Sequence, residues 1–325
     1  MLEEVVATAI KVNKENMLSA KDLPQYQKDH YAVVDLGSNS FHLLIVKYQQ
    51  NEIIVVDKIK QKVRLASGLD RHNKLSESII SQGLNCLQNF AEHLASVPLE
   101  NISIVATATL RIATNRDSFL IQANDILPKP IQLLSGIQEA ETIFKGVSYT
   151  CDSAKKRLVL DIGGASTEII VGSGFTAKHS ISLNIGCVSF NKAFFSDGLL
   201  NADNFTAAVK AAKAKIEPAS EQFISLGWQI AVGSSGTMQA VMEILQYRQC
   251  DLVITLDILY GLEQEMIAAH TIGDVRFDGL REDRIAVLAS GLSILIALFE
   301  SLAIQSVSLS KGALREGLLF SMLKK

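Results

Sequence analysis

Two short segments carry residue types that could do chemistry, and they repeat each other. Residues 32–46 read AVVDLGSNSFHLLIV and residues 158–172 read LVLDIGGASTEIIVG. The matching positions share an offset of 126 residues and are Asp35 with Asp161, Gly37 with Gly163, and Ser40 with Ser166. One hairpin of this kind can reflect turn chemistry alone. Two copies at domain spacing indicate an internal duplication.

The turn of each hairpin predicts a phosphate site. A glycine turn exposes successive backbone N–H groups, which form a concave site for anions. Small side chains let a phosphate approach this backbone. These residues are Ser38, Asn39 and Ser40 in the first copy and Gly163, Gly164, Ala165 and Ser166 in the second. Two facing hairpins would hold one polyanion between two domains.

The second hairpin also predicts a metal site. If residues 163–166 form the loop, Asp161 lies opposite Glu168, with Cβ atoms about 5 Å apart on one face. Two such carboxylates repel each other, and a shared hard cation such as Mg²⁺ or Mn²⁺ would explain their placement. A register shift of one residue would separate them. The same register places Asp35 opposite His42, either near the metal or as a buried carboxylate–imidazole pair.

Arg111 is a further candidate for phosphate binding. It follows Thr107 at the point where a strand meets a helix, and helix N-termini favour anions. Its guanidinium could clamp a phosphate with two donors. The alternative is an ordinary salt bridge on the surface of a helix.

Two other segments join a predicted strand to a predicted helix. Ser135 and Gln138 have the spacing of a capping box, which puts Glu139 in the first helical turn. Glu139 could point into a cleft or merely interact with the helix dipole. Residues 233–237 read GSSGT, so Gly236 and Thr237 are candidates for phosphate or nucleoside binding, or parts of a simple turn.

The elements that must position these residues alternate between strands and helices, which predicts an α/β fold. The strands are expected within residues 31–60, 102–108, 131–136, 158–172, 228–237 and 307–310. The length of 325 residues favours two domains. The predicted division is an N-terminal extension with partial helix at 1–29, domain I at 30–136 and domain II at 137–310, with a closing helix at 311–325 that packs back on domain I.

Composition excludes several classes of protein. A hydrophobic fraction of 48% rules out a disordered chain, and a net charge of −3 excludes a nucleic-acid binder that relies on bulk positive charge. The four cysteines form no CxxC motif, so we expect neither disulfides nor zinc and a reducing, cytoplasmic location. The most apolar stretch, residues 285–299, is shorter than the about 20 residues of a membrane span.

Seven segments, in order, resemble the exopolyphosphatase/guanosine pentaphosphate phosphohydrolase (Ppx/GppA) family. They are VVDLGSNSFHLLIV, VATATLRIATN, SGIQEAETIFKGV, LVLDIGGASTEIIVG, NIGCVSFNKAFF, GSSGTMQAV and LSKGALREGLL. The resemblance covers most of the chain from about residue 30. It implies two actin-like (ribonuclease H-like) domains of duplicated topology flanking a cleft. It also implies that Glu139, the second glutamate of the family's SG-x-E-E-A motif, is the base that activates water.

The sequence departs from the family pattern at two positions near the predicted site. Gln138 replaces the first glutamate of that motif, and Ala165 replaces a glycine of DIGGGS. Both changes leave in place the residues that the resemblance assigns, which are Asp35, Arg111, Glu139, Asp161 and Glu168. Many relatives have a further helical region after the closing helix, so this chain resembles a short, two-domain member.

We therefore expect a Mg²⁺- or Mn²⁺-dependent phosphoanhydride hydrolase that acts on inorganic polyphosphate or on the 5′ γ-phosphate of pppGpp. Glu139 would deprotonate water, and Asp161 and Glu168, with Asp35, would hold the metal. An actin-like ATPase or kinase and a non-catalytic nucleotide- or polyphosphate-sensing module are the alternatives. Nucleic acid and membrane are not expected partners, and a homodimer stays open.

Overall fold

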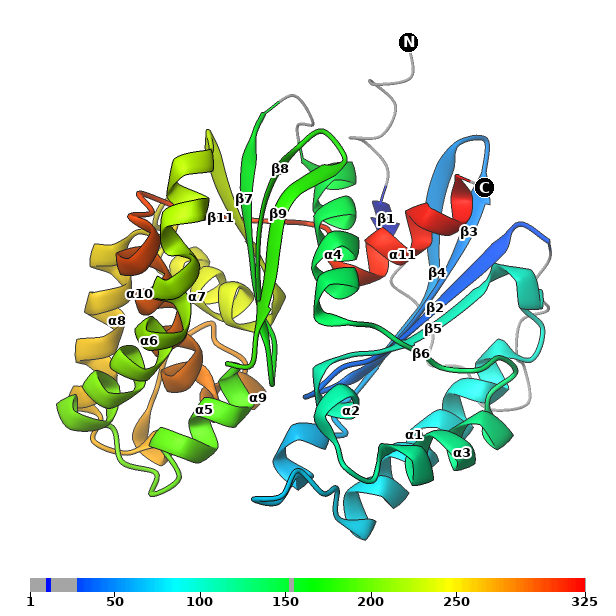
Figure 1. Cartoon of the computed structure of the whole chain (residues 1–325), viewed down its shortest axis with the longest axis horizontal. Helices are drawn as coiled ribbons and strands as arrows, with labels where there is room; N and C mark the ends of the chain where they lie inside the picture. Colours follow the sequence, from blue (N-terminus) through cyan, green and yellow to red (C-terminus); the bar gives the residue numbers. More distant parts are fainter. Residues whose placement is uncertain (1–9, 13–27, 152–154, 325) are drawn as a thin grey trace.

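Two mixed β-sheets organise the chain in the computed structural model, which describes residues 10–12, 28–151 and 155–324 (Figure 1). The first sheet has the strand order β1-β4-β3-β2-β5-β6. Its strands are β1 (Ile10–Val12), β2 (His30–Leu36), β3 (Phe41–Gln49), β4 (Glu52–Gln61), β5 (Ile102–Ala106) and β6 (Gln132–Leu133). The second sheet has the order β11-β10-β7-β8-β9. Its strands are β7 (Arg157–Ile162), β8 (Thr167–Ser173), β9 (Thr176–Leu183), β10 (Ile230–Ser234) and β11 (Ser308–Leu309).

The two sheets have the same topology. The order β4-β3-β2-β5-β6 in the first corresponds to β9-β8-β7-β10-β11 in the second. In each sheet an antiparallel hairpin is followed by strands that pair in parallel. The predicted α/β fold of duplicated topology is therefore confirmed. The predicted partial helix within residues 1–29 lies mostly outside the described residues, and residues 10–12 form a strand parallel to β4 instead.

The helices cover the sheets unequally. The first half contains α1 (Glu77–Leu94), α2 (Ala108–Ile112) and α3 (Arg116–Ile126), and the second contains α5 (Cys187–Phe194), α6 (Ala202–Leu226), α7 (Ser235–Tyr247), α8 (Leu256–Ala268), α9 (Glu282–Ile285) and α10 (Leu288–Leu302). Helix α10 is almost entirely buried in the core of the second half. Among the described residues, none of the helices combines the length and apolar character that a bilayer crossing requires.

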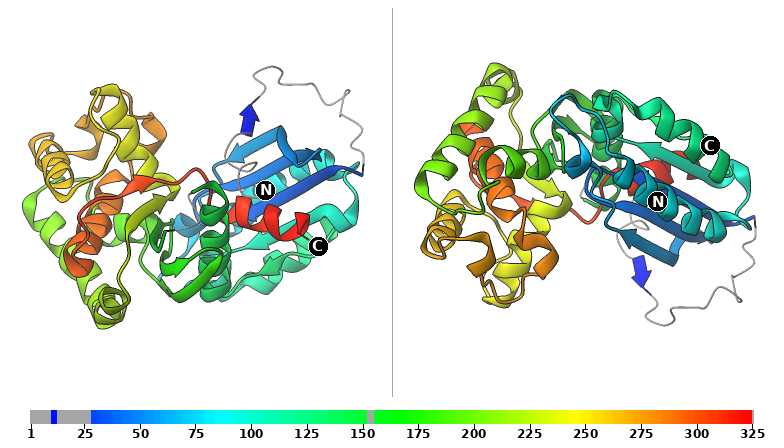
Figure 2. Two further views of the ribbon diagram at one scale, coloured as in Figure 1. Left: turned by 90° about the horizontal axis from the view of Figure 1, so that it is seen from above. Right: turned by 90° about the horizontal axis from the view of Figure 1, so that it is seen from below.

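Two helices lie between the sheets, α4 (Gly136–Thr150) and α11 (Leu314–Leu323) (Figure 1). Helix α4 packs against β8 and β9, and α11 packs against α4 and β2. Figure 2 shows α11, in red, over the blue strands of the first sheet. The predicted boundaries between domains I and II stay a prediction.

Strand alternation decides which residues face α4 and α11. On β2, Val34 packs with α1 and α3, whereas Val33 packs with Leu319 of α11. Successive side chains of a strand point to opposite faces, so Asp35 shares the face of Val33. On β7, Val159 packs with α4, so Asp161 lies on that face. Both aspartates are thus on the inner faces of their sheets.

Candidate active site

The two hairpins have the predicted register. Asp161 pairs with Glu168 and Ile162 pairs with Thr167 between β7 and β8. Asp35 pairs with His42 between β2 and β3. The ring of His42 turns to Arg315, whose Nη1 lies 3.1 Å from His42 Nδ1. The alternative of a buried Asp35–His42 pair is therefore wrong.

The hairpin turns leave backbone N–H groups available to a ligand. The carbonyl groups of Ser38 and Asn39 accept hydrogen bonds from the N–H groups of residues 66 and 64, at 2.9 and 2.8 Å. The carbonyl group of Gly164 accepts from the N–H of Val188 at the start of α5, at 2.9 Å. Within the described part of the chain, the N–H groups of Ser38, Asn39 and Gly164 have no acceptor. Free N–H groups on an anchored turn are what an anion requires.

The two turns touch each other. A Cβ atom built on Gly164 would lie 2.9 Å from Ser38 Cβ and 3.3 Å from Asn39 N. Gly164 is therefore needed for a close approach of the two halves, not for an unusual backbone conformation. A ligand bound at one turn is necessarily near the other.

A side chain at residue 164 should hold the two halves apart. Gly164→Ala would force the turns to separate, and overpacking of this kind costs about 1–3 kcal/mol. We expect an unchanged fold by circular dichroism and a larger radius of gyration by small-angle X-ray scattering in the presence of a polyanion. Gly261→Ala, on the exposed side of α8, has no neighbour within 4 Å of the added Cβ and controls for the replacement of glycine by alanine. Equal scattering curves for wild type and Gly164→Ala would contradict the need for close approach.

Glu139 lies at the start of α4, where the predicted capping box is present. The Ser135 N–H donates to Gln138 Oε1 at 2.9 Å, and the Gln138 N–H donates to Ser135 Oγ at 3.2 Å. Gln138 is exposed, whereas Glu139 is 7% exposed and lines the cavity. The replacement of a family glutamate by Gln138 therefore changes a helix cap and leaves the cavity wall unchanged.

Arg111 contacts Glu139. Its Nη1 donates to Glu139 Oε2 at 2.9 Å and to the Leu134 carbonyl oxygen at 3.0 Å. Arg111 does not line the cavity directly. The structure thus places Arg111 beside Glu139, the predicted base. A contact between Arg111 and a phosphate group stays a prediction.

Four acidic side chains lie together and repel one another. Burial raises the pKa of Glu139 to about 7, against the opposing effect of Arg111. Burial raises the pKa of Asp35 and of Asp161 to about 6 each. Burial and the nearby charges of Glu139 and Asp161 hold the pKa of Glu168 well above its usual range. Such a cluster favours either protons or a bound cation.

The acidic cluster can supply one or two carboxylate ligands to a divalent cation, with water and phosphate oxygens as the other ligands. Asp35 Oδ1 is buried without a hydrogen-bond partner among the described residues. Asp161 Oδ2 accepts from Ser234 Oγ at 2.5 Å, and Glu168 Oε1 accepts from Ser182 Oγ at 2.7 Å. In the described ranges, no three histidine, cysteine or acidic side chains are grouped closely enough to hold a metal by themselves. Mg²⁺ commonly binds one or two carboxylates and takes water and phosphate oxygens as its other ligands.

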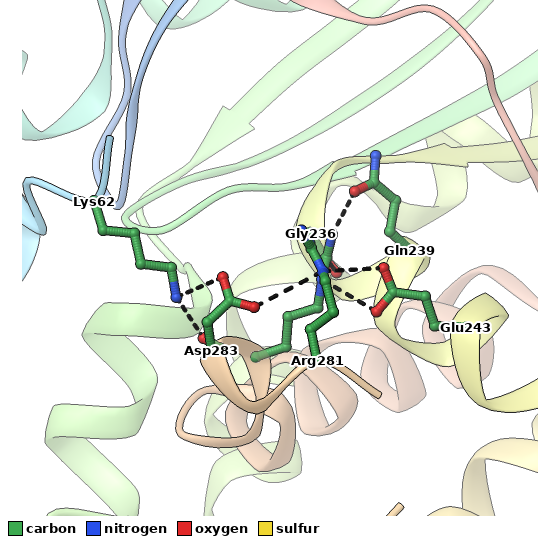
Figure 3. Close-up of polar contacts among 7 residues, drawn as sticks. Lys62, Gly236, Gln239, Glu243, Arg281 and Asp283 are labelled. Carbon is green, nitrogen blue, oxygen red and sulfur yellow. Dashed lines mark hydrogen bonds and ion pairs between the residues drawn. The ribbon is translucent and has the colours of Figure 1, made fainter. Parts of the chain in front are cut away.

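The GSSGT segment joins β10 to α7, as predicted, and Arg284 holds it in place. Arg284 Nη1 donates to the Gly236 carbonyl oxygen, and Arg284 Nη2 donates to Gln239 Oε1 at 2.5 Å. Figure 3 shows this turn beside Asp283, whose Oδ2 lies 2.7 Å from Nζ of Lys62 in the first half. This ion pair bridges the two halves at the cavity.

One cavity between the two halves brings most of the predicted residues together. Its lining includes Asp35, Ser38, Asn39, Ser40, Glu139, Asp161, Gly163, Gly164, Ser166, Gly236 and Thr237. Arg111 and Glu168 are not part of this lining. The sequence alone assigned no role to the lysines and arginines of this lining, which are Lys58, Lys60, Lys62, Arg284, Lys311 and Arg315. Lysine recurs at every second position at residues 58, 60 and 62. This spacing in the sequence could have identified three of them as neighbours on one face of a strand.

Comparison with known proteins agrees with this arrangement. The sequence profile described as the Ppx/GppA phosphatase family matches residues 44–325. A protein of Vibrio parahaemolyticus named guanosine-5′-triphosphate,3′-diphosphate pyrophosphatase is 51% identical over 292 residues. That match covers 90% of this chain and 59% of the relative. A protein of the same name from Pseudoalteromonas atlantica is 47% identical over 309 residues, covering 95% of this chain and 61% of the relative. The chain thus spans about three fifths of the length of the curated relatives that it matches.

Solved structures share the fold. An exopolyphosphatase from Cytophaga hutchinsonii superposes with a TM-score of 0.81 at 21% identity, covering 91% of this chain and 98% of the other. The Ppx/GppA family member from Aquifex aeolicus gives a TM-score of 0.74, also at 21% identity, covering 91% and 97% of the two chains.

Proposed function

Because the chain belongs to the Ppx/GppA phosphatase family, we propose that it hydrolyses a terminal phosphoanhydride bond, with pppGpp as the first candidate substrate. The names of the curated relatives favour this nucleotide. Inorganic polyphosphate is the second candidate, since it presents the same terminal bond. The observation that carries the proposal is the meeting of two N–H-rich turns with the acidic side chains of Asp35, Glu139 and Asp161 at one cavity.

In this proposal the chain's own residues position the phosphate and activate water. The N–H groups of Ser38, Asn39 and Gly164 bind the terminal phosphate from both halves of the protein. Glu139 accepts a proton from the attacking water, and its raised pKa suits a base that works near neutral pH. Arg111 holds the carboxylate of Glu139 in position through its 2.9 Å contact. Positioning and charge neutralisation dominate phosphoryl transfer in general.

Asp35 and Asp161 would hold Mg²⁺ or Mn²⁺ at the inner faces of the sheets, with Glu168 acting through water. When bound, such an ion neutralises negative charge on the phosphate oxygens. Asp35 Oδ1 has no other described partner, which makes it available for this contact.

An assay with pppGpp, polyphosphate and ATP in parallel tests the proposal. We expect phosphate release from pppGpp, and comparison with polyphosphate measures the preference between the two candidates. Hydrolysis of ATP alone would favour an actin-like ATPase. Binding of pppGpp without turnover would favour a sensing module.

Replacing Arg111 with lysine should weaken use of the substrate. Lysine keeps the positive charge but loses the planar fork of donors, and loss of a charged hydrogen bond costs about 1.5–3 kcal/mol. We expect a fall in kcat/KM of at least about tenfold and a thermal midpoint that changes by no more than about 4 °C. A collapse of the thermal midpoint would instead mean that Arg111 stabilises the fold through Leu134 and Glu139.

A further inference from the structure

Two lysines on the cavity wall have no acidic partner in direct contact. Lys58 and Lys60 are two residues apart on β4, so their side chains leave the same face of the first sheet. Both line the cavity that also contains Glu139 and Asp161. In the part of the chain that the structure describes, neither ammonium group makes an ion pair or a hydrogen bond. These lysines are therefore available to a ligand.

The strand register places Lys60 beside the acidic cluster and outside it. Lys60 pairs with His42 on β3, and His42 pairs with Asp35 on β2. Directly paired residues point to the same face, so Lys60 is two strands away from Asp35, roughly 10 Å across the sheet. A group that binds Lys58 and Lys60 would therefore be next to the reacting phosphate.

Other positive charges surround this pair of lysines. Burial, together with Arg284 and Arg281, lowers the pKa of Lys60 to about 8, although Asp283 acts in the opposite direction. Burial and the guanidinium of Arg315 lower the pKa of Lys58, although Glu316 acts in the opposite direction. Arg315 comes from α11, and the other two arginines come from the second half. An anion between these groups would relieve their mutual repulsion.

We propose that Lys58 and Lys60 form a second anion site, which binds a phosphate group of the substrate other than the one being hydrolysed. This inference rests on the proposed function. A 3′-diphosphate on the same nucleotide is one source of such a group, and the distal phosphates of a polyphosphate chain are the other. Compact ammonium groups bind phosphates of either kind as point charges. The site would distinguish a substrate that carries a second phosphate group from one that lacks it.

Binding of ppGpp and GDP tests the site directly, because the two nucleotides differ only in the 3′-diphosphate. We would measure both affinities by isothermal titration calorimetry for wild type and for the double variant Lys58→Gln/Lys60→Gln. Wild type should bind ppGpp at least about tenfold more tightly than GDP, as expected for a charge-assisted contact. The ratio should fall close to one in the double variant. Circular dichroism would verify that the variant is folded.

Lys178→Gln is the matched control. Lys178 is exposed on β9, the strand that corresponds to β4 in the second sheet, and it does not line the cavity. Its substitution should leave the ratio of the two affinities as in wild type.

A second pair of probes distinguishes the two sources of phosphate. If distal polyphosphate groups occupy the site, the double variant should lose its preference for long-chain polyphosphate over tripolyphosphate. The four probes are ppGpp, GDP, long-chain polyphosphate and tripolyphosphate. The proposal would be overturned if the double variant lost affinity equally for all four, or lost none for any of them. Binding needs no turnover, so a wild type that hydrolyses neither substrate would contradict the proposed function and leave this test intact.

Discussion

Glu139→Gln should reduce turnover at least about 10²-fold, the low end for loss of a general base, and leave the fold intact. Glutamine has nearly the shape of glutamate but cannot accept the proton from water. It also removes one negative charge from the cluster, so binding of a polyanion should be preserved or become tighter. Single-turnover kinetics and calorimetry with the same nucleotide would separate these two effects.

Glu141 offers a matched control on the same helix. It lies two positions further along α4, about 200° around the helix, and it is exposed. Glu141→Gln should change turnover by less than about twofold, as expected for a surface substitution. If Glu141→Gln lost activity and Glu139→Gln kept it, the assignment of the base would be wrong.

The pH profile gives a second test of the same residue. Burial raises the pKa of Glu139 to about 7, and only the ionised carboxylate can accept a proton. Wild-type kcat/KM should therefore be low in acid, rise with pH, and reach half of its plateau near pH 7. That rise should be absent from the residual activity of Glu139→Gln.

Removal of divalent metal should abolish activity. The acidic cluster of Asp35, Asp161 and Glu168 motivates this expectation, because burial of repelling carboxylates favours a bound cation. Activity should vanish in EDTA and return on addition of excess Mg²⁺ or Mn²⁺. Full activity in the chelator would eliminate the metal from the proposed reaction.

A thermal measurement checks the metal without relying on activity. A ligand that binds the folded state stabilises it by about 2.7 kcal/mol at a concentration of 100 Kd. Mg²⁺ should therefore raise the thermal midpoint of wild type in the absence of substrate. Asp161→Asn should lose this response. An equal response in Asp161→Asn would place any metal elsewhere.

Local rules were enough to predict much of this protein from its sequence. The pairing of Asp161 with Glu168 follows from the length of a four-residue loop, because side chains in a hairpin alternate with a period of two. The position of Glu139 in the first turn of α4 follows from the capping box at Ser135. The duplicated hairpins predicted the duplicated topology, since each copy repeats the same sequence of strand and turn. All these features depend on neighbours within a few residues.

Other features depend on how distant segments pack, and the sequence did not reveal them. Strand β9 was not predicted, because it forms through pairing with β8 and has no strong apolar alternation of its own. The contact of Arg111 with Glu139 joins residues on separate helices. The approach of Gly164 to Ser38 requires the two halves to close on each other. The gathering of Lys58, Lys60 and Arg315 requires α11 to return to the first sheet, so only the tertiary structure could place these charges at one cavity.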